Sequence, residues 1–452
     1  MRRRSRPDHG LPDRPDHGLP DQPDSESPSQ PGPETPDPAA NLPILATPAD
    51  GFGPVITERL ALDTLADALA GDSEPVALDA ERASGFRYHS WAYLIQLKTA
   101  STGIALIDPV AFTANPPADL SRLGRALAER EWVLHAASQD LLCLAEVGLR
   151  PTRLFDTELA ARLAGRPRVG LGPLVEDILG LRLLKQHSSA DWSTRPLPDS
   201  WLDYAALDVE LLVELRDRLD AELTAAGKRE WASQEFQHWI DWAAAPPPPP
   251  EEPWRRTAGI HEVRSARGLA LVRELWQARD KTARQLDLAP GRVLKDAGLT
   301  ELARHATDSS MNVKPSDLDR SAWFARRPAP RFRAVWAAAL ERATALPPAD
   351  WPLPRLPYDG PPPTRSWRSF DPAAAARWAA VRPAVNDLAE RLCLPPENLL
   401  SPDALRRLAW APSGLDAEAV NRQLENSGAR PWQRGLVTPV LVQALAAVHR
   451  QG

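Results

Sequence analysis

Five consecutive prolines occupy positions 246–250 of this 452-residue chain. Such a run favours the extended polyproline II conformation and acts as a stiff spacer between folded units. A second proline-rich segment covers residues 346–366. A chain of this length fits two to four domains at about 100–200 residues each. We therefore expect three folded units, at residues 54–243, 254–345 and 367–452, joined by linkers at residues 244–253 and 346–366.

The first 43 residues have a composition that is typical of a disordered tail. They contain the heptapeptide Pro-Asp-His-Gly-Leu-Pro-Asp twice, at residues 7–13 and 15–21, and few residues able to build a core. The repeated His9 and His17 could bind a metal, but solvated tail histidines are the simpler interpretation. We expect ordered structure to begin near Val55.

Neither a transmembrane segment nor a signal peptide is expected. No apolar run approaches the roughly 20 residues needed to cross a bilayer, and no apolar stretch follows the basic N-terminus. The two cysteines, Cys143 and Cys393, permit at most one disulfide, and reduced thiols are the simpler interpretation. These features favour a cytoplasmic protein.

Residues 54–243 alternate between strand-like and helical patterns. Strand-like runs lie at residues 75–79, 93–97, 104–107 and 132–135, and helical patterns at residues 60–70, 120–129, 140–147 and 203–223. Strands that come first and then alternate with helices predict an α/β domain with a mixed sheet. The two later units read as all-helical, and helices in the last one are expected to start after Asp371, Ser401 and Asp416.

The net charge of -6 hides an uneven distribution of charge along the chain. Residues 54–243 hold 19 Lys and Arg against 29 Asp and Glu, a net of -10, whereas residues 254–342 hold 18 against 10, a net of +8. A basic unit can hold a polyanion while an acidic one holds cations. Charge alone leaves open a chance distribution over solvated faces.

Two acidic residues end the first strand-like run, in the segment Val-Ala-Leu-Asp-Ala-Glu at residues 76–81. In a strand, the i, i+2 spacing of Asp79 and Glu81 puts both carboxylates on one face, with Ala80 pointing away. Like charges so close repel each other unless a cation lies between them. Alone, this pattern is weak evidence, because most such pairs are solvated strand ends.

Two further segments carry acids in similar settings. Asp140 follows the strand at residues 132–135 and begins a helix, where an acid also complements the helix dipole. Tyr204 and Asp208 are spaced i, i+4 and so share one helical face, with Asp203 on another side. Each segment is weak evidence by itself.

Taken together, the three segments resemble the DEDDy exonucleases in the order and contexts of Asp79, Glu81, Asp140 and Asp208, with Tyr204 four residues before the last acid. Four carboxylates in one cleft are unfavourable without compensating charge, and hard divalent cations prefer oxygen ligands. The resemblance implies that these acids bind two Mg²⁺ or Mn²⁺ ions. It also implies that the Tyr204 hydroxyl orients the attacking water or helps to remove its proton.

Other segments resemble ribonuclease D in particular. Phe-Asp-Thr follows at residues 155–157, and Lys185 precedes Asp-Trp-Ser-Thr-Arg-Pro-Leu at residues 191–197. The resemblance implies that Lys185, Trp192 and Arg195 lie near the wall of the active site or the substrate strand. The alternative is that Trp192 and Pro196 simply pack the domain. Ala80 stands where the family often has a polar residue, but its side chain is expected to face away from the metals.

The helical tail resembles HRDC domains, the small helical modules of RecQ helicases and ribonuclease D. Residues 267–306 have the residue pattern expected of an HRDC domain, and residues 374–447 resemble a diverged second copy of that domain. The resemblance covers roughly residues 54–449. It implies a ribonuclease H-like mixed sheet flanked by helices, followed by two all-α HRDC-type domains.

The resemblance implies a 3′→5′ exoribonuclease that removes nucleotides one at a time and produces 5′-phosphomonoesters. It favours RNA with a free 3′ end as the substrate, tRNA precursors above all. Two alternatives stay open. The same acids serve DNA exonucleases, and no residue identifies a contact to the ribose 2′-hydroxyl that would distinguish RNA. A non-catalytic RNA-binding protein is the other, although all five catalytic-type residues are present.

Overall fold

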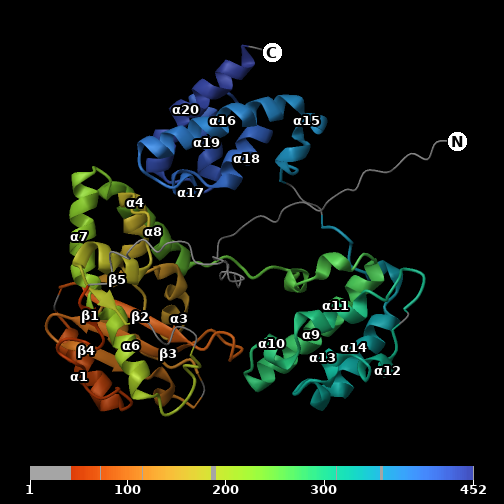
Figure 1. Ribbon diagram of the computed structural model, residues 1–452, viewed down its shortest axis with the longest axis horizontal. Helices are drawn as coiled ribbons and strands as arrows, with labels where there is room; N and C mark the ends of the chain where they lie inside the picture. The colour runs from red at the N-terminus through yellow and green to blue at the C-terminus, as the bar shows by residue number, and fades with distance from the viewer. Residues whose placement is uncertain are drawn as a thin grey trace, which may run out of the picture.

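The computed structural model describes residues 42–71, 73–114, 116–184, 190–311, 313–356 and 360–450. The N-terminal repeat and Lys185 lie outside these residues, so the predictions made for them stay predictions. None of the helices in the described ranges is long and apolar enough to cross a membrane. The chain forms an α/β unit (β1 to α8), a first helical unit (α9 to α14) and a second helical unit (α15 to α20) (Figure 1).

A five-stranded mixed sheet forms the centre of the α/β unit, with the strand order β4-β3-β2-β5-β6. The antiparallel pairs are β2 with β3 and β3 with β4, whereas β5 runs parallel to both β2 and β6. The strands are β2 (Val76–Arg82), β3 (Ala92–Thr99), β4 (Gly103–Ile107), β5 (Glu131–Leu134) and β6 (Arg153–Asp156). The sequence predicts the first four of these strands and misses β6. A separate parallel pair joins β1 (Ile44–Leu45) to β7 (Arg182–Leu183).

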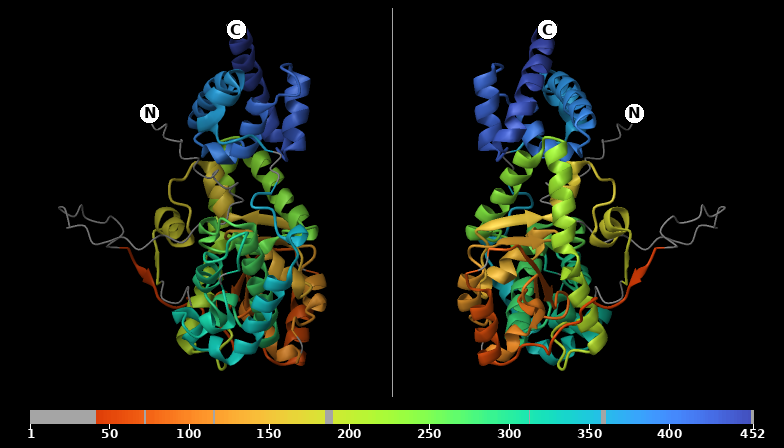
Figure 2. Two further views of the ribbon diagram at one scale, coloured as in Figure 1. Left: turned by 90° about the vertical axis from the view of Figure 1, so that its right-hand side faces the viewer. Right: turned by 90° about the vertical axis from the view of Figure 1, so that its left-hand side faces the viewer.

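The helices of the α/β unit lie on both sides of the sheet and at one end of it (Figures 1 and 2). They are α1 (Arg59–Leu69), α2 (Ser121–Ala126), α3 (Leu141–Glu146), α4 (Thr157–Ala164), α5 (Leu171–Leu174), α6 (Asp199–Glu210), α7 (Leu212–Ala225) and α8 (Arg229–Ala244). This arrangement confirms the predicted mixed sheet flanked by helices.

The single helix predicted at residues 203–223 is wrong, because the chain breaks at Leu211 into α6 and α7. The Lys98 ammonium donates to the backbone carbonyl of Glu210 over 2.7 Å and pairs with its carboxylate over 3.0 Å. This contact from β3 competes with the helical hydrogen bond of that carbonyl. The break lets α6 cross β2 and β3, while α7 packs on β5 and α4.

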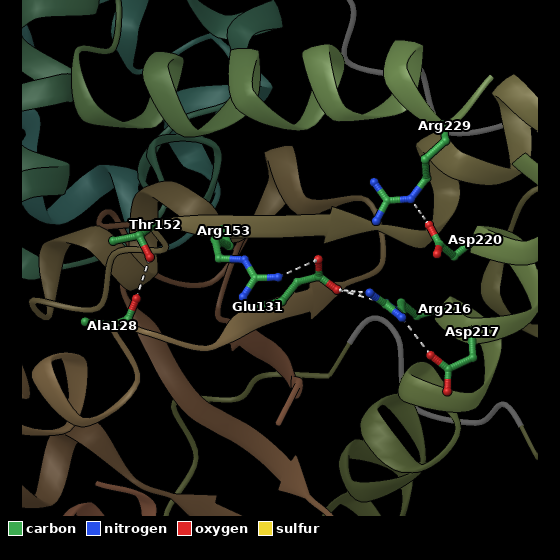
Figure 3. A network of polar contacts seen from close by, with 8 residues as sticks. All are labelled: Ala128, Glu131, Thr152, Arg153, Arg216, Asp217, Asp220 and Arg229. Carbon is green, nitrogen blue, oxygen red and sulfur yellow. Dashed lines mark hydrogen bonds and ion pairs between the residues drawn. The ribbon is translucent and has the colours of Figure 1, made fainter. Parts of the chain in front are cut away.

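Figure 3 shows a polar network that ties α7 to the sheet. The Arg216 side chain of α7 donates from Nε to the Glu131 carboxylate of β5 over 2.8 Å, and Arg153 of β6 pairs with the same carboxylate over 3.8 Å. Arg216 also lies over the Phe155 ring, 5.4 Å from its centroid. These contacts fix α7, and through the short turn at Leu211 also α6, against the parallel strands.

The first helical unit has its own core, built around α9 (Ala266–Leu286) and α14 (Arg333–Ala345). Between these two long helices lie short ones, α10 (Pro290–Val293), α11 (Asp296–Ala303), α12 (Pro315–Leu318) and α13 (Ala322–Ala325). Trp254 and Trp336 are both buried in this core. The core is separate from that of the α/β unit, as the proline spacer predicts.

The second helical unit contains α15 (Trp367–Phe370), α16 (Pro372–Arg391), α17 (Pro396–Leu399), α18 (Pro402–Trp410), α19 (Ala417–Asn426) and α20 (Pro431–His449). All three predicted helix starts are confirmed. The side chains of Asp371, Ser401 and Asp416 each accept a hydrogen bond from the backbone N–H three residues later, over 2.9, 3.2 and 3.0 Å. Each therefore satisfies one of the free N–H groups at its helix start.

Unlike the first, the second helical unit shares one hydrophobic core with the α/β unit (Figure 2). Trp432 of α20 stacks on Trp231 of α8 with ring centroids 5.0 Å apart. Gly165, at the end of α4, approaches this unit so closely that a Cβ there would lie 2.7 Å from the carbonyl oxygen of Cys393. The second helical unit is thus packed onto the α/β unit although a proline-rich segment precedes it.

Candidate active site

The strand β2 presents two carboxylates toward α6. Asp79 and Glu81 are partly exposed, while Ala80 between them is buried on the opposite face, as the i, i+2 spacing predicts. Asp208 of α6 completes a cluster in which one carboxylate oxygen from each of the three acids lies within 4.8 Å of the others. The packing of α6 across β2 and β3 thus joins two of the three predicted segments.

Asp140 reaches the same site from the third segment. It is the N-cap residue of α3 and only 5% exposed, and it lies close enough to Asp79 that burial and then the charge of Asp79 raise its pKa. Arg82, the residue after the β2 pair, places its Nε 3.7 Å from the Asp140 carboxylate. A break in the register of β2 with β3 between Glu81 and Arg82 accompanies this turn of the arginine toward Asp140.

A buried carboxylate behind the site shapes the turn that carries Asp140. Asp156 accepts hydrogen bonds from the backbone N–H groups of Ala136 and Ala137, over 3.1 and 2.9 Å. It also caps α4 by accepting from Glu158 N and Leu159 N. Ala136 has a φ of 57°, a left-handed conformation that costs a non-glycine residue free energy. Asp156 therefore holds a strained turn in place, and this turn directs the chain into the 3₁₀ turn at Ala137–Gln139 before Asp140.

Tyr204 lies one helical turn before Asp208 on α6 and is half-buried. Its ring lies beside the buried Trp192, with centroids 6.5 Å apart. Burial, followed by the negative charges of Asp208 and Glu81, raises the pKa of the Tyr204 hydroxyl well above its ordinary value. The hydroxyl therefore stays protonated beside the carboxylates at neutral pH.

Three of the four acids sit in an environment that disfavours their charged forms. Burial raises the pKa of Asp79 to about 6, against the opposing effects of the Ala80 backbone and Arg82. Burial and then the charge of Asp79 raise the pKa of Glu81 to about 9 and that of Asp140 well above its usual range. Only added positive charge would let all four acids ionise together at neutral pH.

The predicted substrate-binding residues are placed differently. Trp192 is buried and packs edge-on against Trp201, at 5.4 Å between centroids, as well as against Tyr204. Arg195 forms a two-pronged pair with Asp108, from Nε over 2.6 Å and from Nη2 over 2.7 Å. It also donates to the carbonyls of Tyr93 and Trp192, each over 2.7 Å. These contacts support the packing role for Trp192, which forms part of the wall behind Tyr204. The substrate-binding role of Arg195 stays a prediction.

Two residues of the site are not among the candidates drawn from the sequence. Arg82 has no local signature beyond its place after Glu81, since its approach to Asp140 depends on the fold. Asp156 is different, because it belongs to the Phe-Asp-Thr segment that resembles ribonuclease D. Its role, which is to position the turn before Asp140, follows only from its four backbone hydrogen bonds.

The donor set of this site fits divalent metal ions. Asp79, Glu81 and Asp208 offer only carboxylate oxygens, which are the ligands that hard cations such as Mg²⁺ prefer. Asp140 adds a fourth carboxylate beside Asp79. Bound cations would also offset the free-energy cost of burying these negative charges. The site can therefore hold divalent cations and place a water beside the Tyr204 hydroxyl.

Three family models match successive parts of the chain. Residues 55–224 match a model described as 3′-5′ exonuclease, and residues 268–314 match the HRDC domain. Residues 360–445, which form most of the second helical unit, match a model described as the C-terminal domain of a 3′ to 5′ exonuclease. The two helical units thus match two different models.

Curated relatives and solved structures agree with these matches. The chain is 33% identical to ribonuclease D of Granulibacter bethesdensis over 290 residues, 62% of this chain and 69% of that protein. It is 34% identical to ribonuclease D of Acidiphilium cryptum over 258 residues, 55% of this chain but only 63% of the relative's length. A solved protein from Bifidobacterium adolescentis is 37% identical, with a TM-score of 0.81 over 90% of this chain and 100% of that one. Ribonuclease D of Escherichia coli is 28% identical, with a TM-score of 0.62 over 83% of this chain and 99% of that one.

The mixed sheet, its flanking helices and the carboxylate cluster beside a tyrosine define a 3′-5′ exonuclease domain, a class of protein that depends on divalent metal. The HRDC match and the ribonuclease D relatives then identify one family within this class. The chain belongs to the ribonuclease D family.

Proposed function

We propose that this chain is a 3′→5′ exoribonuclease that hydrolyses the terminal phosphodiester of RNA and releases 5′-phosphomonoesters one at a time. The observation that carries the proposal is the convergence of Asp79, Glu81 and Asp208, whose carboxylate oxygens lie within 4.8 Å of one another, with the Asp140 carboxylate beside Asp79. Three segments far apart in the sequence meet there in the order that the DEDDy exonucleases have.

Asp79, Glu81, Asp140 and Asp208 would hold two Mg²⁺ or Mn²⁺ ions. Such ions supply a nucleophilic water at neutral pH and stabilise the charge that develops on the attacking and leaving oxygens. The carboxylates come from β2, α3 and α6, so the sheet and the helices fix their positions before substrate binds. Asp156 contributes by holding the backbone before Asp140, not by touching the substrate.

The Tyr204 hydroxyl lies on the same face of α6 as Asp208. In our proposal it hydrogen-bonds the attacking water and orients it toward the phosphorus. The raised pKa of Tyr204 agrees with a hydroxyl that stays protonated and positions the water. The carboxylate site would then remove the proton from that water. Positioning of this kind typically contributes about 10²–10⁴-fold to the rate.

RNA with a free 3′ end is the proposed substrate, and tRNA precursors in the cytoplasm are the proposed natural targets. Two observations support this. The Escherichia coli relative is described as an exoribonuclease involved in structured RNA processing. In this chain, residues 254–342 carry a net charge of +8, which suits a polyanion.

The test uses purified full-length protein with 5′-labelled RNA and DNA of the same sequence, in Mg²⁺, Mn²⁺ or excess EDTA. We expect a ladder of RNA products shortened from the 3′ end in either metal and none in EDTA. Circular RNA should resist, because it has no terminus. The Asp208→Asn variant serves as a control for contaminating nucleases. Undiminished degradation in EDTA would overturn the mechanism, and preferential cleavage of the DNA would make this a DNA exonuclease instead.

A further inference from the structure

A cavity of about 550 Å³ opens where the first helical unit meets the loop after β2. Gly85 of that loop lines one side of it. The other side is formed by the first helical unit and includes Arg292, Lys295, Trp323, Arg326 and Arg327. We call this the junction cavity. It lies outside the carboxylate site, and none of the acids of that site lines it.

Every charged side chain that lines the junction cavity is a cation. Arg292, Lys295, Arg326 and Arg327 are all exposed, and no Asp or Glu is among the lining residues. Within the described ranges, none of the four forms an ion pair, although many arginines of this chain do. Four neighbouring cations without acidic partners repel one another, and a bound polyanion would relieve that repulsion.

Two of these arginines are held in place by the fold. Arg292 donates from Nε to the carbonyl of Gly85 over 2.6 Å, and its guanidinium lies 4.1 Å from the centroid of the Phe86 ring. Arg326 lies over the Trp323 ring, 4.8 Å from its centroid. A guanidinium that is already oriented loses less conformational entropy when it binds a phosphate. The cavity is therefore partly organised for an anion.

The junction cavity lies close to the carboxylate site along the chain. Gly85 is four residues after Glu81, and four residues span at most about 14 Å even when fully extended. An RNA strand whose 3′ end occupies the carboxylate site therefore needs to extend only a few nucleotides to reach the cations. The acidic α/β unit offers such a strand much less favourable charge, since residues 54–243 carry a net of -10.

We propose that the junction cavity binds phosphates of the RNA strand on the 5′ side of the nucleotide that is removed. This inference rests on the proposed exonuclease function and adds to it a backbone-binding site that spans two units of the chain. Contacts of this type position a strand without reading its sequence, so the cavity serves RNAs of any sequence.

The test compares two double variants of the full-length protein. Lys295→Glu/Arg327→Glu reverses two cations of the cavity. Arg382→Glu/Arg391→Glu makes the same change in charge at two exposed arginines of α16 in the second helical unit, neither of which forms an ion pair among the described residues. Lys295→Gln/Arg327→Gln removes the two charges without reversing them. A loss of RNA binding that this milder variant shares is then not the result of misfolding.

Binding to long single-stranded RNA is measured across a range of salt concentrations, with Asp208→Asn added to each protein to prevent turnover. For a single strand, each lost phosphate contact lowers the magnitude of the slope of log K against log salt by about 0.7. The slope of each cavity variant should therefore be smaller in magnitude by about 1.4 than that of the wild type. In the active background, they should raise KM severalfold on long RNA. Their kcat, and their KM on oligonucleotides too short to reach the cavity, should match those of the control.

Equal salt slopes and equal KM values in the cavity and control variants would overturn the inference. Failure of the proposed function looks different, because the wild-type protein would then not shorten RNA from the 3′ end in either metal. The binding assay does not depend on turnover, so it tests the cavity in that case too.

Discussion

The two helical units are attached to the α/β unit in opposite ways. The first contacts it mainly through polar groups of the loop after β2. Tyr88 donates from its hydroxyl to Asp280 over 2.9 Å and from its backbone to Asp287 over 3.2 Å. The backbone of Ala289 donates to the carbonyl of Phe86 over 3.0 Å. This junction lies directly after the strand that carries Asp79 and Glu81.

The second helical unit is joined through a continuous core. Trp432 stacks on Trp231 and donates from its indole to Glu235 over 2.8 Å. Lys228 donates from Nζ to two backbone carbonyls, those of Leu163 in the α/β unit and Leu392 in the second unit. We infer from this contrast that the two units have different roles. The first lies where it can influence substrate near the active site, and the second stabilises the fold.

The proline spacer alone suggests that truncation at residues 246–250 would leave a complete catalytic unit. Because the second helical unit shares the core of the α/β unit, such a truncation would instead remove part of that core. The truncated protein would expose Trp231 and leave the buried Glu235 carboxylate without Arg430 and Trp432. For this reason the contributions of the two units are better separated by point substitutions than by truncation.

The largest expected effect is on catalysis, from Asp79→Asn. It removes the charge of a predicted metal ligand but keeps its size, so metal-dependent turnover should fall below detection. Because burial disfavours the charged aspartate, the metal-free variant should melt no lower than wild type at neutral pH. Turnover of labelled RNA and thermal melting check the two parts. Near-normal turnover would remove Asp79 from the metal site.

Tyr204→Phe should reduce kcat by about 10²–10⁴-fold, because only the hydroxyl that positions water is lost. Its effect on RNA binding should be small, since binding is assigned to the first helical unit. Single-turnover kinetics and RNA affinity in the same buffer distinguish the two. Unchanged single-turnover rates would mean that Tyr204 is only a packing partner of Trp192.

Trp432→Ala tests whether the second junction stabilises the α/β unit. Truncation of a buried tryptophan typically lowers the free energy of unfolding by about 3–5 kcal/mol. Chemical denaturation should show this loss, while the folded fraction keeps its turnover rate. Phe370→Ala is a matched control on the same unit, because that side chain is 74% exposed. A loss no larger than that of the control would contradict the shared core.

The carboxylate site should make the stability of the metal-free protein depend on pH. The pKa values of Asp79 and Glu81 rise from 3.8 and 4.5 to about 6 and about 9 on folding, so the folded state binds more protons than the unfolded state between these values. Stability is therefore highest below about pH 4 and declines as the pH rises from about 4 to about 9.

Added Mg²⁺ or Mn²⁺ should counteract this decline, because metal binds the deprotonated carboxylates and binds the folded state. Melting temperatures measured across that pH range, with metal and with EDTA, provide the test. Glu81→Gln should flatten the EDTA curve. A metal-free Tm that rises steadily with pH would contradict the burial of these acids.

The smallest effect is expected at the first junction, from Tyr88→Phe. The Tyr88 hydroxyl donates to Asp280 and accepts from Arg284 at a partly exposed site. Loss of these hydrogen bonds should lower the free energy of unfolding by no more than about 1 kcal/mol. Chemical denaturation of Tyr88→Phe and of Trp432→Ala compares the two losses in the free energy of unfolding. Equal losses in the two variants would show that both junctions stabilise the fold alike.

Much of the fold follows from signals that are local in the sequence. The alternation around Asp79 and Glu81 predicts their common face, and the caps at Asp371, Ser401 and Asp416 predict three helix starts. These predictions succeed because each depends on residues within one strand or one helical turn. The missed strand β6 has four residues, too short for a clear period.

The sequence identifies the residues that could carry the chemistry, because carboxylates and a tyrosine in three ordered segments match one family of sites. How these residues meet depends on the tertiary fold. Lys98 binds the carbonyl of Glu210 where α6 ends, and Asp156 holds the turn before Asp140. The structure also shows that Trp192 is buried beside Tyr204, that Arg195 is held by Asp108, and that the second helical unit joins the central core. The physical reason is that these contacts join residues far apart in the chain, and burial and pairing across such distances leave no period or spacing in the sequence.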